Sequence, residues 1–236
     1  MDSQTVENKI DQYYIGGRSK IYVKRLHVFD PPSSPLLSVE SKFITAEFDA
    51  KYNDFENFLQ IIDPISFPLK YLRTGTGGLH TYDHPVLRSA ETLLIDLSEE
   101  QSEAEMICLQ KLPCKTISFF YDLEIIDTVR MINYMIENPK EIGTKYTFIE
   151  FNRKFVYSEL MRIKQAFEGN RHDLEETTSF GRKYYPRFCI PVNPISKLHV
   201  YAVENDKQCF FIIKVVPESG EEFTEKAELV AQSSIK

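Results

Sequence analysis

The sequence lacks the features that mark several large classes of protein. Its 236 residues hold no run near the ~18 apolar residues of a membrane-spanning helix, and its first twenty residues are polar rather than signal-like. We therefore expect no membrane association and a cytoplasmic location, with the nucleus as the alternative. A basic balance is missing too: the formal net charge of −7 argues against a nucleic-acid-binding protein.

Paired cysteines are also absent. The four cysteines stand far apart or without a CxxC spacing, at Cys108, Cys114, Cys189 and Cys209. A structural zinc site needs paired ligands at tight spacing, so this pattern does not predict one. We expect reduced thiols that pack as small apolar groups, and we expect no metal and no cofactor.

The common catalytic motifs are incomplete. The glycine-rich stretch "RTGTGGLH" (73–80) has no lysine after its glycines, as a Walker A loop requires. A dinucleotide fingerprint needs G-x-G-x-x-G opening a helix, and Leu79 and His80 stand where that pattern should continue. No G-x-S-x-G nucleophile elbow is present. We interpret 73–80 as a loop with glycines at positive φ, and we expect that the chain is not an enzyme.

The stretch "HTYDH" (80–84) holds the remaining candidates for chemistry. His80 and His84 have the spacing of two ligands on one helix face, but Pro85 and the preceding glycines disfavour a helix here. Asp83 is better explained as the cap of a helix that begins at Pro85. We therefore expect no metal site, and we keep four residues of this region as candidates for contacting a partner: Arg73, His80, Tyr82 and Asp83.

Strand-like and helix-like segments alternate along most of the chain. Strands are expected at 21–29, 43–49, 68–74, 92–97, 115–121 and 145–151. Helices are expected at 53–62 (capped by Asn53), 85–90, 102–112 (with Ala104, Ile107, Cys108 and Leu112 inward) and 127–138 (capped by Asp127), and around the apolar stripe Val156, Leu160, Ile163 and Phe167. Units of roughly 20 to 30 residues are typical of leucine-rich repeats. The pattern predicts an α/β fold, an irregular leucine-rich-repeat-like strand–helix solenoid, although the asparagine ladder is missing. A doubly wound α/β sheet gives the same alternation and is the alternative.

The same patterns predict a domain organisation. Residues 1–18 are expected to form a helix and a turn, and 19–217 a single repeat-like domain. Within it, the strand-like runs 197–203 and 209–216 predict a β-hairpin (197–216) that caps the repeats. The charged segment 218–236 is expected to be a disordered tail.

Several stretches together carry a family resemblance: "YYIGGRSKIYVKRLHV" (13–28), "PISFPLKYLRTG" (64–75), "YDHPVLRSAETLLIDLS" (82–98), "LQKLPCKTISF" (109–119) and "MINYMIENPKEIGTKYTFIEF" (131–151). They resemble a large nematode family that bears a domain of unknown function and whose longer relatives are similar to worm F-box proteins. The resemblance implies a binding module that presents substrates to a cullin-type ubiquitin ligase. It carries no catalytic residue over to this chain. About 18 residues precede the first strand, fewer than the ~40 of an F-box, so we expect no F-box here.

The leading hypothesis is therefore a non-enzymatic protein-interaction module with an unidentified protein partner, related to ubiquitin ligases in its narrower form. The sheet face and the strand-end loops, including 73–84, would contact that partner. The alternative hypothesis is a small-ligand-binding protein or enzyme that uses the 73–84 loop.

Overall fold

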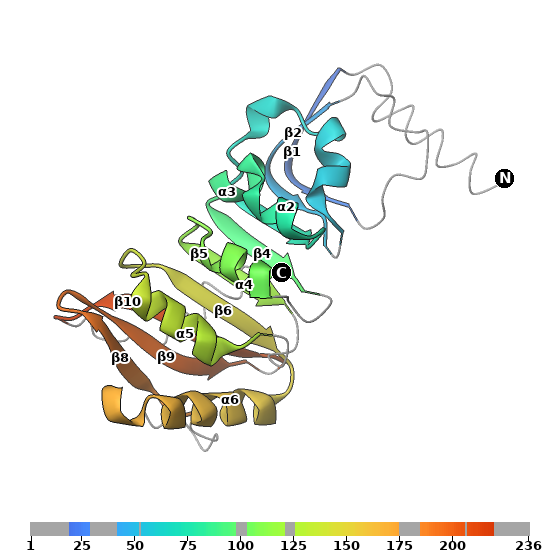
Figure 1. Cartoon of the computed structure of the whole chain (residues 1–236). Helices are drawn as coiled ribbons and strands as arrows, with labels where there is room; N and C mark the ends of the chain where they lie inside the picture. The colour runs from blue at the N-terminus through green and yellow to red at the C-terminus, as the bar shows by residue number, and fades with distance from the viewer. Residues whose placement is uncertain are drawn as a thin grey trace. The chain divides into compact units, whose positions relative to one another are not determined.

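The structure is a computed structural model that describes residues 19–28, 42–51, 53–97, 103–120, 126–174, 185–205 and 207–219. It divides into two compact units (Figure 1): Met1–Ser98 with Leu112–Cys114, and Glu99–Lys111 with Lys115–Lys236. The helix expected within 1–18 and nearly all of the expected tail lie outside the described residues. The single domain expected over 19–217 stays a prediction.

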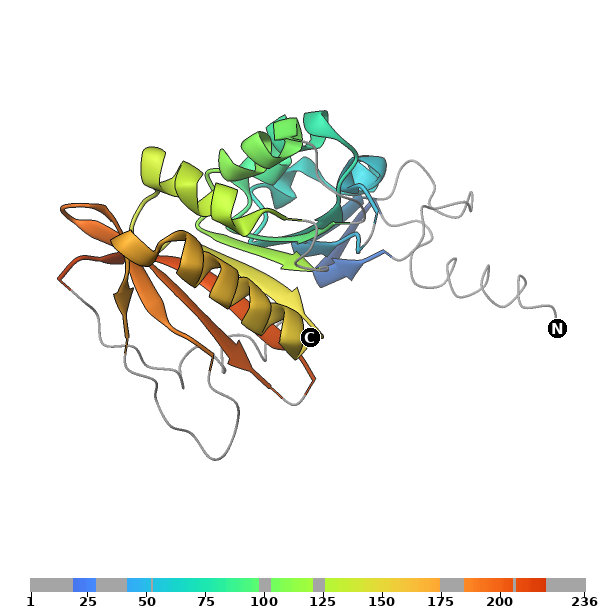
Figure 2. The same ribbon diagram turned by 60° about the horizontal axis from the view of Figure 1, so that its bottom comes forward.

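The first unit is built on four parallel strands that neighbour one another in chain order. They are β1 (Lys20–His27), β2 (Lys42–Asp49), β3 (Tyr71–Gly75) and β4 (Thr92–Asp96). The connections form the 3₁₀ helices η1 (Phe55–Ile61) and η2 (Pro64–Ser66) and the short α-helices α2 (Leu79–Asp83) and α3 (Pro85–Ser89). Figure 2 shows the helices of this unit on one side of its strands, and fully buried side chains such as Phe48, Phe58 and Leu72 form its core.

Helix η1 differs from the α-helix expected at 53–62. Its buried residues Phe55, Phe58 and Ile61 recur every three positions, which is the period of a 3₁₀ helix. Its cap is Asp54, whose Oδ1 accepts a hydrogen bond from the Glu56 amide at 3.0 Å, and not Asn53. The α-helical period and the predicted cap were both wrong at this connection.

The second unit is a mixed sheet. Its strands follow the order β5 (Thr116–Phe120), β6 (Lys145–Glu150), β10 (Cys209–Pro217), β9 (Ser196–Glu204), β8 (Phe188–Asn193) and β7 (His172–Asp173). β5 and β6 are parallel, whereas β10 pairs antiparallel with both β6 and β9. Its helices are α4 (Glu103–Gln110), α5 (Thr128–Glu137), α6 (Arg153–Ala166) and η4 (Glu168–Asn170). Helix α6 runs across β9 and β10 (Figure 2).

The α/β class and the C-terminal hairpin, formed by β9 and β10, are confirmed. A leucine-rich-repeat-like solenoid is not shown, because the connections are dissimilar in length and helix type and the last strands pair antiparallel. The doubly wound alternative is not shown either, since the strand order of the first unit follows the chain without a reversal. No helix in the described ranges is long and apolar enough to cross a bilayer.

The buried face was predicted correctly for helix α6 of the second unit and wrongly for helix α4. All four residues of the stripe expected on α6, from Val156 to Phe167, are buried. On α4 the expected inward residue Ala104 is exposed, and Met106 and Leu109 are buried instead. The apolar residues of "EAEMICLQ" nearly follow one another, so their spacing does not select one face.

A candidate site at the strand ends of the first unit

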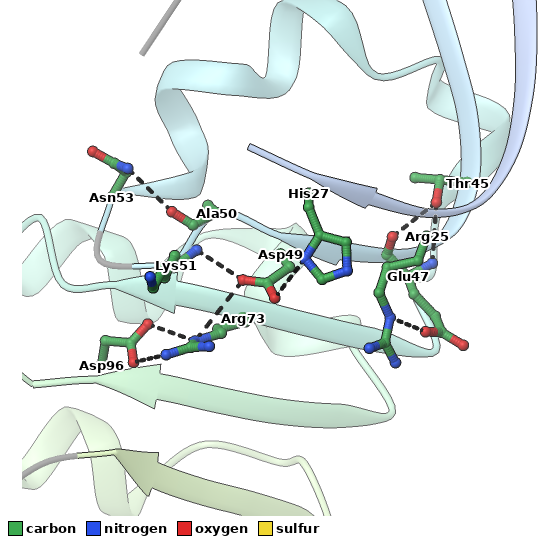
Figure 3. Close-up of polar contacts among 10 residues, drawn as sticks. All are labelled: Arg25, His27, Thr45, Glu47, Asp49, Ala50, Lys51, Asn53, Arg73 and Asp96. Atoms are coloured by element: carbon green, nitrogen blue, oxygen red, sulfur yellow. Dashed lines mark hydrogen bonds and ion pairs between the residues drawn. The ribbon is translucent and has the colours of Figure 1, made fainter. Parts of the chain in front are cut away.

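Charged side chains gather where the parallel strands of the first unit end. Because the carboxyl ends of parallel strands meet at one edge of a sheet, residues that close neighbouring strands lie side by side. The last residues of β1, β2 and β4 are His27, Asp49 and Asp96. In β3, Arg73 lies two residues before the end of the strand. These four residues, here called the charged row, lie across the four strands in Figure 3.

The charged row alternates basic and acidic side chains along the strand ends. Arg73 donates from Nε and Nη2 to the two carboxylate oxygens of Asp96, at 2.9 and 2.8 Å. Arg73 Nε also lies 3.8 Å from Asp49 Oδ1, and His27 Nδ1 lies 2.9 Å from Asp49 Oδ2. Burial raises the pKa of the Asp96 carboxyl, and the Arg73 guanidinium opposes that rise. Each carboxylate faces a cation, so the row is suited to holding the strand ends together.

A second group of ligand-type side chains lies in the connections that follow β2 and β3. Asp54 and Glu56 stand at the start of η1, and His80 lies in α2. One ligand atom from each residue lies within 4.8 Å of the others. His80 Nε2 is 3.8 Å from Glu56 Oε2. We call these three residues the acid–histidine cluster. Two carboxylates and an imidazole are ligand types that divalent transition metals use.

The Asp54 carboxylate is held from two sides. Its Oδ1 caps η1, and its Oδ2 lies 3.4 Å from the Thr81 hydroxyl, which donates to it. Gly77 passes so close that a Cβ there would lie 1.9 Å from Asp54 Oδ2. Gly78 has the positive φ expected for this loop, at 111°. Gly77 therefore provides space for Asp54, and Gly78 provides the backbone conformation.

The four candidate residues from the sequence have different surroundings. Arg73 belongs to the charged row and His80 to the acid–histidine cluster. The Tyr82 side chain is buried, at 1% exposure, and Asp83 is exposed with Oδ1 at 3.7 Å from Arg88 Nη1. Their predicted contact with a partner stays a prediction.

Two expectations about the helices at 79–89 were wrong. A helix, α2, opens directly at Leu79 after the glycines. The cap of α3 is His84, whose Nδ1 accepts a hydrogen bond from the Val86 amide at 3.2 Å, and not Asp83. His84 therefore has a structural role between the two helices, while His80 lies with Asp54 and Glu56.

The sequence did not predict that four acidic residues belong to this region: Asp49, Asp54, Glu56 and Asp96. A signal for two of them was available, because "EFD" places Asp49 at the end of one predicted strand and "LID" places Asp96 next to the end of another. If the strands are parallel neighbours, these ends meet, and the charges that follow them meet as well. The missing information was which strands are neighbours.

Comparisons with known proteins give a family but no activity. A family model described as a domain of unknown function (DUF3557) matches residues 8–149, more than half of the chain. The chain matches no curated protein and no solved structure. The expected domain of unknown function is thus confirmed, whereas the relationship to nematode F-box proteins stays a prediction. The chain belongs to the DUF3557 family.

Proposed function

We propose that this protein is a non-enzymatic protein-interaction module that binds its partner through the solvent-exposed side chains of α6. The observation that carries the proposal is the exposure of three large apolar side chains on this helix: Phe155 (38%), Tyr157 (46%) and Met161 (42%). Tyr157 and Met161 are four residues apart, so they adjoin on the helix surface. Aromatic residues and methionine are enriched in protein interfaces.

The charge of α6 supports a particular kind of partner. Its sequence RKFVYSELMRIKQA holds four basic residues and one acidic residue, in a chain whose formal net charge is −7. A partner segment with apolar anchors flanked by acidic side chains would complement this surface. The proposal includes no nucleic acid and no membrane, and it places the protein in the cytoplasm or nucleus.

A narrower form of the proposal is substrate recognition of the kind implied by the resemblance to F-box relatives, with a partner related to ubiquitin ligases. That form is supported by the sequence resemblance alone. The solenoid-like arrangement of the strand–helix units belongs to the same expectation.

The test begins with photo-crosslinking in an extract of the source organism. A photoreactive residue replaces Tyr157, and in a control protein it replaces Ile195, an equally apolar side chain that is 70% exposed in the same unit. A partner captured only from position 157 is then purified, and its affinity for the whole chain is measured.

We expect the double variant Tyr157→Ser/Met161→Ser to bind the purified partner at least about tenfold more weakly, because interface anchors of this type dominate binding energy. Ile195→Ser should bind like the unchanged protein. Equal affinity of the double variant, or capture of the same proteins from positions 157 and 195, would overturn the proposal.

A further inference from the structure

We propose that Asp54, Glu56 and His80 bind one divalent transition-metal ion of the zinc type. This inference goes beyond the proposed function, because it concerns the first unit and needs no protein partner. It departs from the expectation, drawn from ligand spacing in the sequence, that the chain has no metal site. The three ligands come from two connections that only the pairing of β2 with β3 brings together.

The distances fit one ion after a small adjustment. Zinc at ~2.0–2.2 Å from nitrogen and oxygen ligands in tetrahedral geometry places those ligands roughly 3.4 Å apart. The separation of His80 Nε2 from Glu56 Oε2 is 3.8 Å, and all three ligand atoms lie within 4.8 Å of one another. The His80 side chain is 65% exposed, so its ring can turn without disturbing the core.

The Glu56 carboxylate provides an independent observation. Its Oε1 atom is buried and has no hydrogen-bond partner within the described part of the chain. A buried carboxylate oxygen without a partner costs free energy, and a cation bound by both Glu56 oxygens would remove that cost. An ion pair with protonated His80 does not account for this atom, because His80 faces Oε2 and exposed pairs of this kind contribute little.

Asp54 is arranged in advance for the same role. Its carboxylate is oriented by the Glu56 amide and the Thr81 hydroxyl, and such supporting contacts keep metal ligands in place. The close approach of Gly77 leaves no room for a side chain beside Oδ2. Two carboxylates two residues apart repel each other, and a shared cation converts that repulsion into attraction.

The ligand set indicates which ions fit. Carboxylates alone suit magnesium or calcium, whereas an imidazole shifts the preference towards zinc and its neighbours. Three protein ligands leave a fourth position for water, and the exposure of His80 puts that position on the solvent side. The inferred site is therefore open rather than closed by protein ligands.

The experiment is a calorimetric titration of the chelator-treated full chain with Zn²⁺ in excess Mg²⁺, which occupies nonspecific carboxylates. We expect one Zn²⁺ per chain. His80→Ala and Glu56→Gln should each weaken Zn²⁺ binding at least about tenfold. Even the loss of a group that only orients a metal ligand weakens metal binding by about that much. Asp83→Asn, an exposed carboxylate in the same helix as His80, should bind Zn²⁺ like the unchanged protein.

Gly77→Ala tests the geometry while all three ligands stay present. The added Cβ would displace the Asp54 carboxylate, so we expect weaker Zn²⁺ binding with circular dichroism unchanged. The proposal is overturned if the full chain takes up no Zn²⁺. It is also overturned if His80→Ala and Glu56→Gln bind as tightly as the unchanged protein, because the ion would then be held by other donors, such as thiols.

Discussion

The Arg73–Asp96 pair is the most deeply buried ion pair of the charged row. The Asp96 side chain is 2% exposed and that of Arg73 is 16% exposed, and two hydrogen bonds join them. Removing one partner of such a pair leaves a charge that the protein interior does not solvate. The pair therefore matters for stability mainly because each charge compensates the other in the protein interior, and less through the attraction between them.

We expect Asp96→Asn to lower the free energy of unfolding by about 3 kcal/mol, because the buried Arg73 guanidinium then loses the carboxylate to which it donates two hydrogen bonds. Urea unfolding at pH 7 measures the change. Asp83→Asn is the matched control, since its exposed pair with Arg88 should be worth less than about 0.5 kcal/mol. Equal effects of the two substitutions would contradict a stabilising role for the buried pair.

His199 is the residue with the clearest pH dependence. Burial lowers its pKa to about 4, and the positive charges of Arg187, Lys214 and Lys197 act in the same direction. The folded state therefore favours neutral imidazole, while the unfolded chain takes up a proton near the ordinary pKa of about 6.5. Stability from this residue is present above pH 6.5 and is lost as the pH falls towards 4.

We expect the free energy of unfolding to fall by roughly 2 kcal/mol between pH 7 and pH 5 through His199 alone. In His199→Gln this part of the pH dependence should disappear, whatever the stability of the variant at pH 7. Denaturant unfolding at a series of pH values gives the result, and an unchanged slope in His199→Gln would refute the argument.

At the scale of elements, the sequence predicted helices with a long, regular apolar stripe and failed on short connections. The stripe of α6 spans three turns, so only one face can be buried. In η1 the buried apolar residues recur every three positions, as in a 3₁₀ helix, rather than alternately every three and four positions, as in an α-helix. A segment of only seven residues is too short for the sequence to distinguish these two spacings. The helix type of such a short element is decided more by its packing against the sheet than by the spacing of its own apolar residues.

The candidate site was predictable only in part for a related reason. The loop at 73–84 was singled out, but its cluster partners Asp54 and Glu56 come from the preceding connection. Their approach depends on the parallel pairing of β2 with β3, which strand–helix alternation leaves open. The sequence thus identified one side of the acid–histidine cluster and not the other.

The N-terminal cap of α5 was predicted correctly and can be tested. Asp127 Oδ1 accepts a hydrogen bond from the Arg130 amide at 3.2 Å. Asp127→Ala should lower the free energy of unfolding by about 1 kcal/mol, whereas Asp127→Ser, which can still cap, should cost much less. Thermal unfolding of both variants provides the measurement. Equal losses would point instead to the exposed ion pair of Asp127 with Arg162, which both substitutions remove.

At the scale of the whole molecule, the strand order predicts where the backbone is best protected. In the second unit β10 has neighbours on both sides, and most of its side chains are buried. β7 has two residues, both exposed, and pairs only with β8 among the described strands. We expect amides of β10 to exchange with solvent on the order of 100-fold more slowly than those of 171–174. Hydrogen exchange followed by mass spectrometry tests this, and similar rates would contradict the central position of β10.

The pairing of β6 with β10 also sets an order for synthesis on the ribosome. β6 ends at Glu150 and its partner begins at Cys209, so the outer edge of β6 waits for almost sixty further residues before its antiparallel neighbour exists. The family match ends at residue 149, inside β6, so this neighbour is supplied entirely by the part of the chain beyond the match. A nascent chain arrested before β10 would carry an open apolar strand edge, which is the kind of surface that chaperones recognise and that otherwise aggregates.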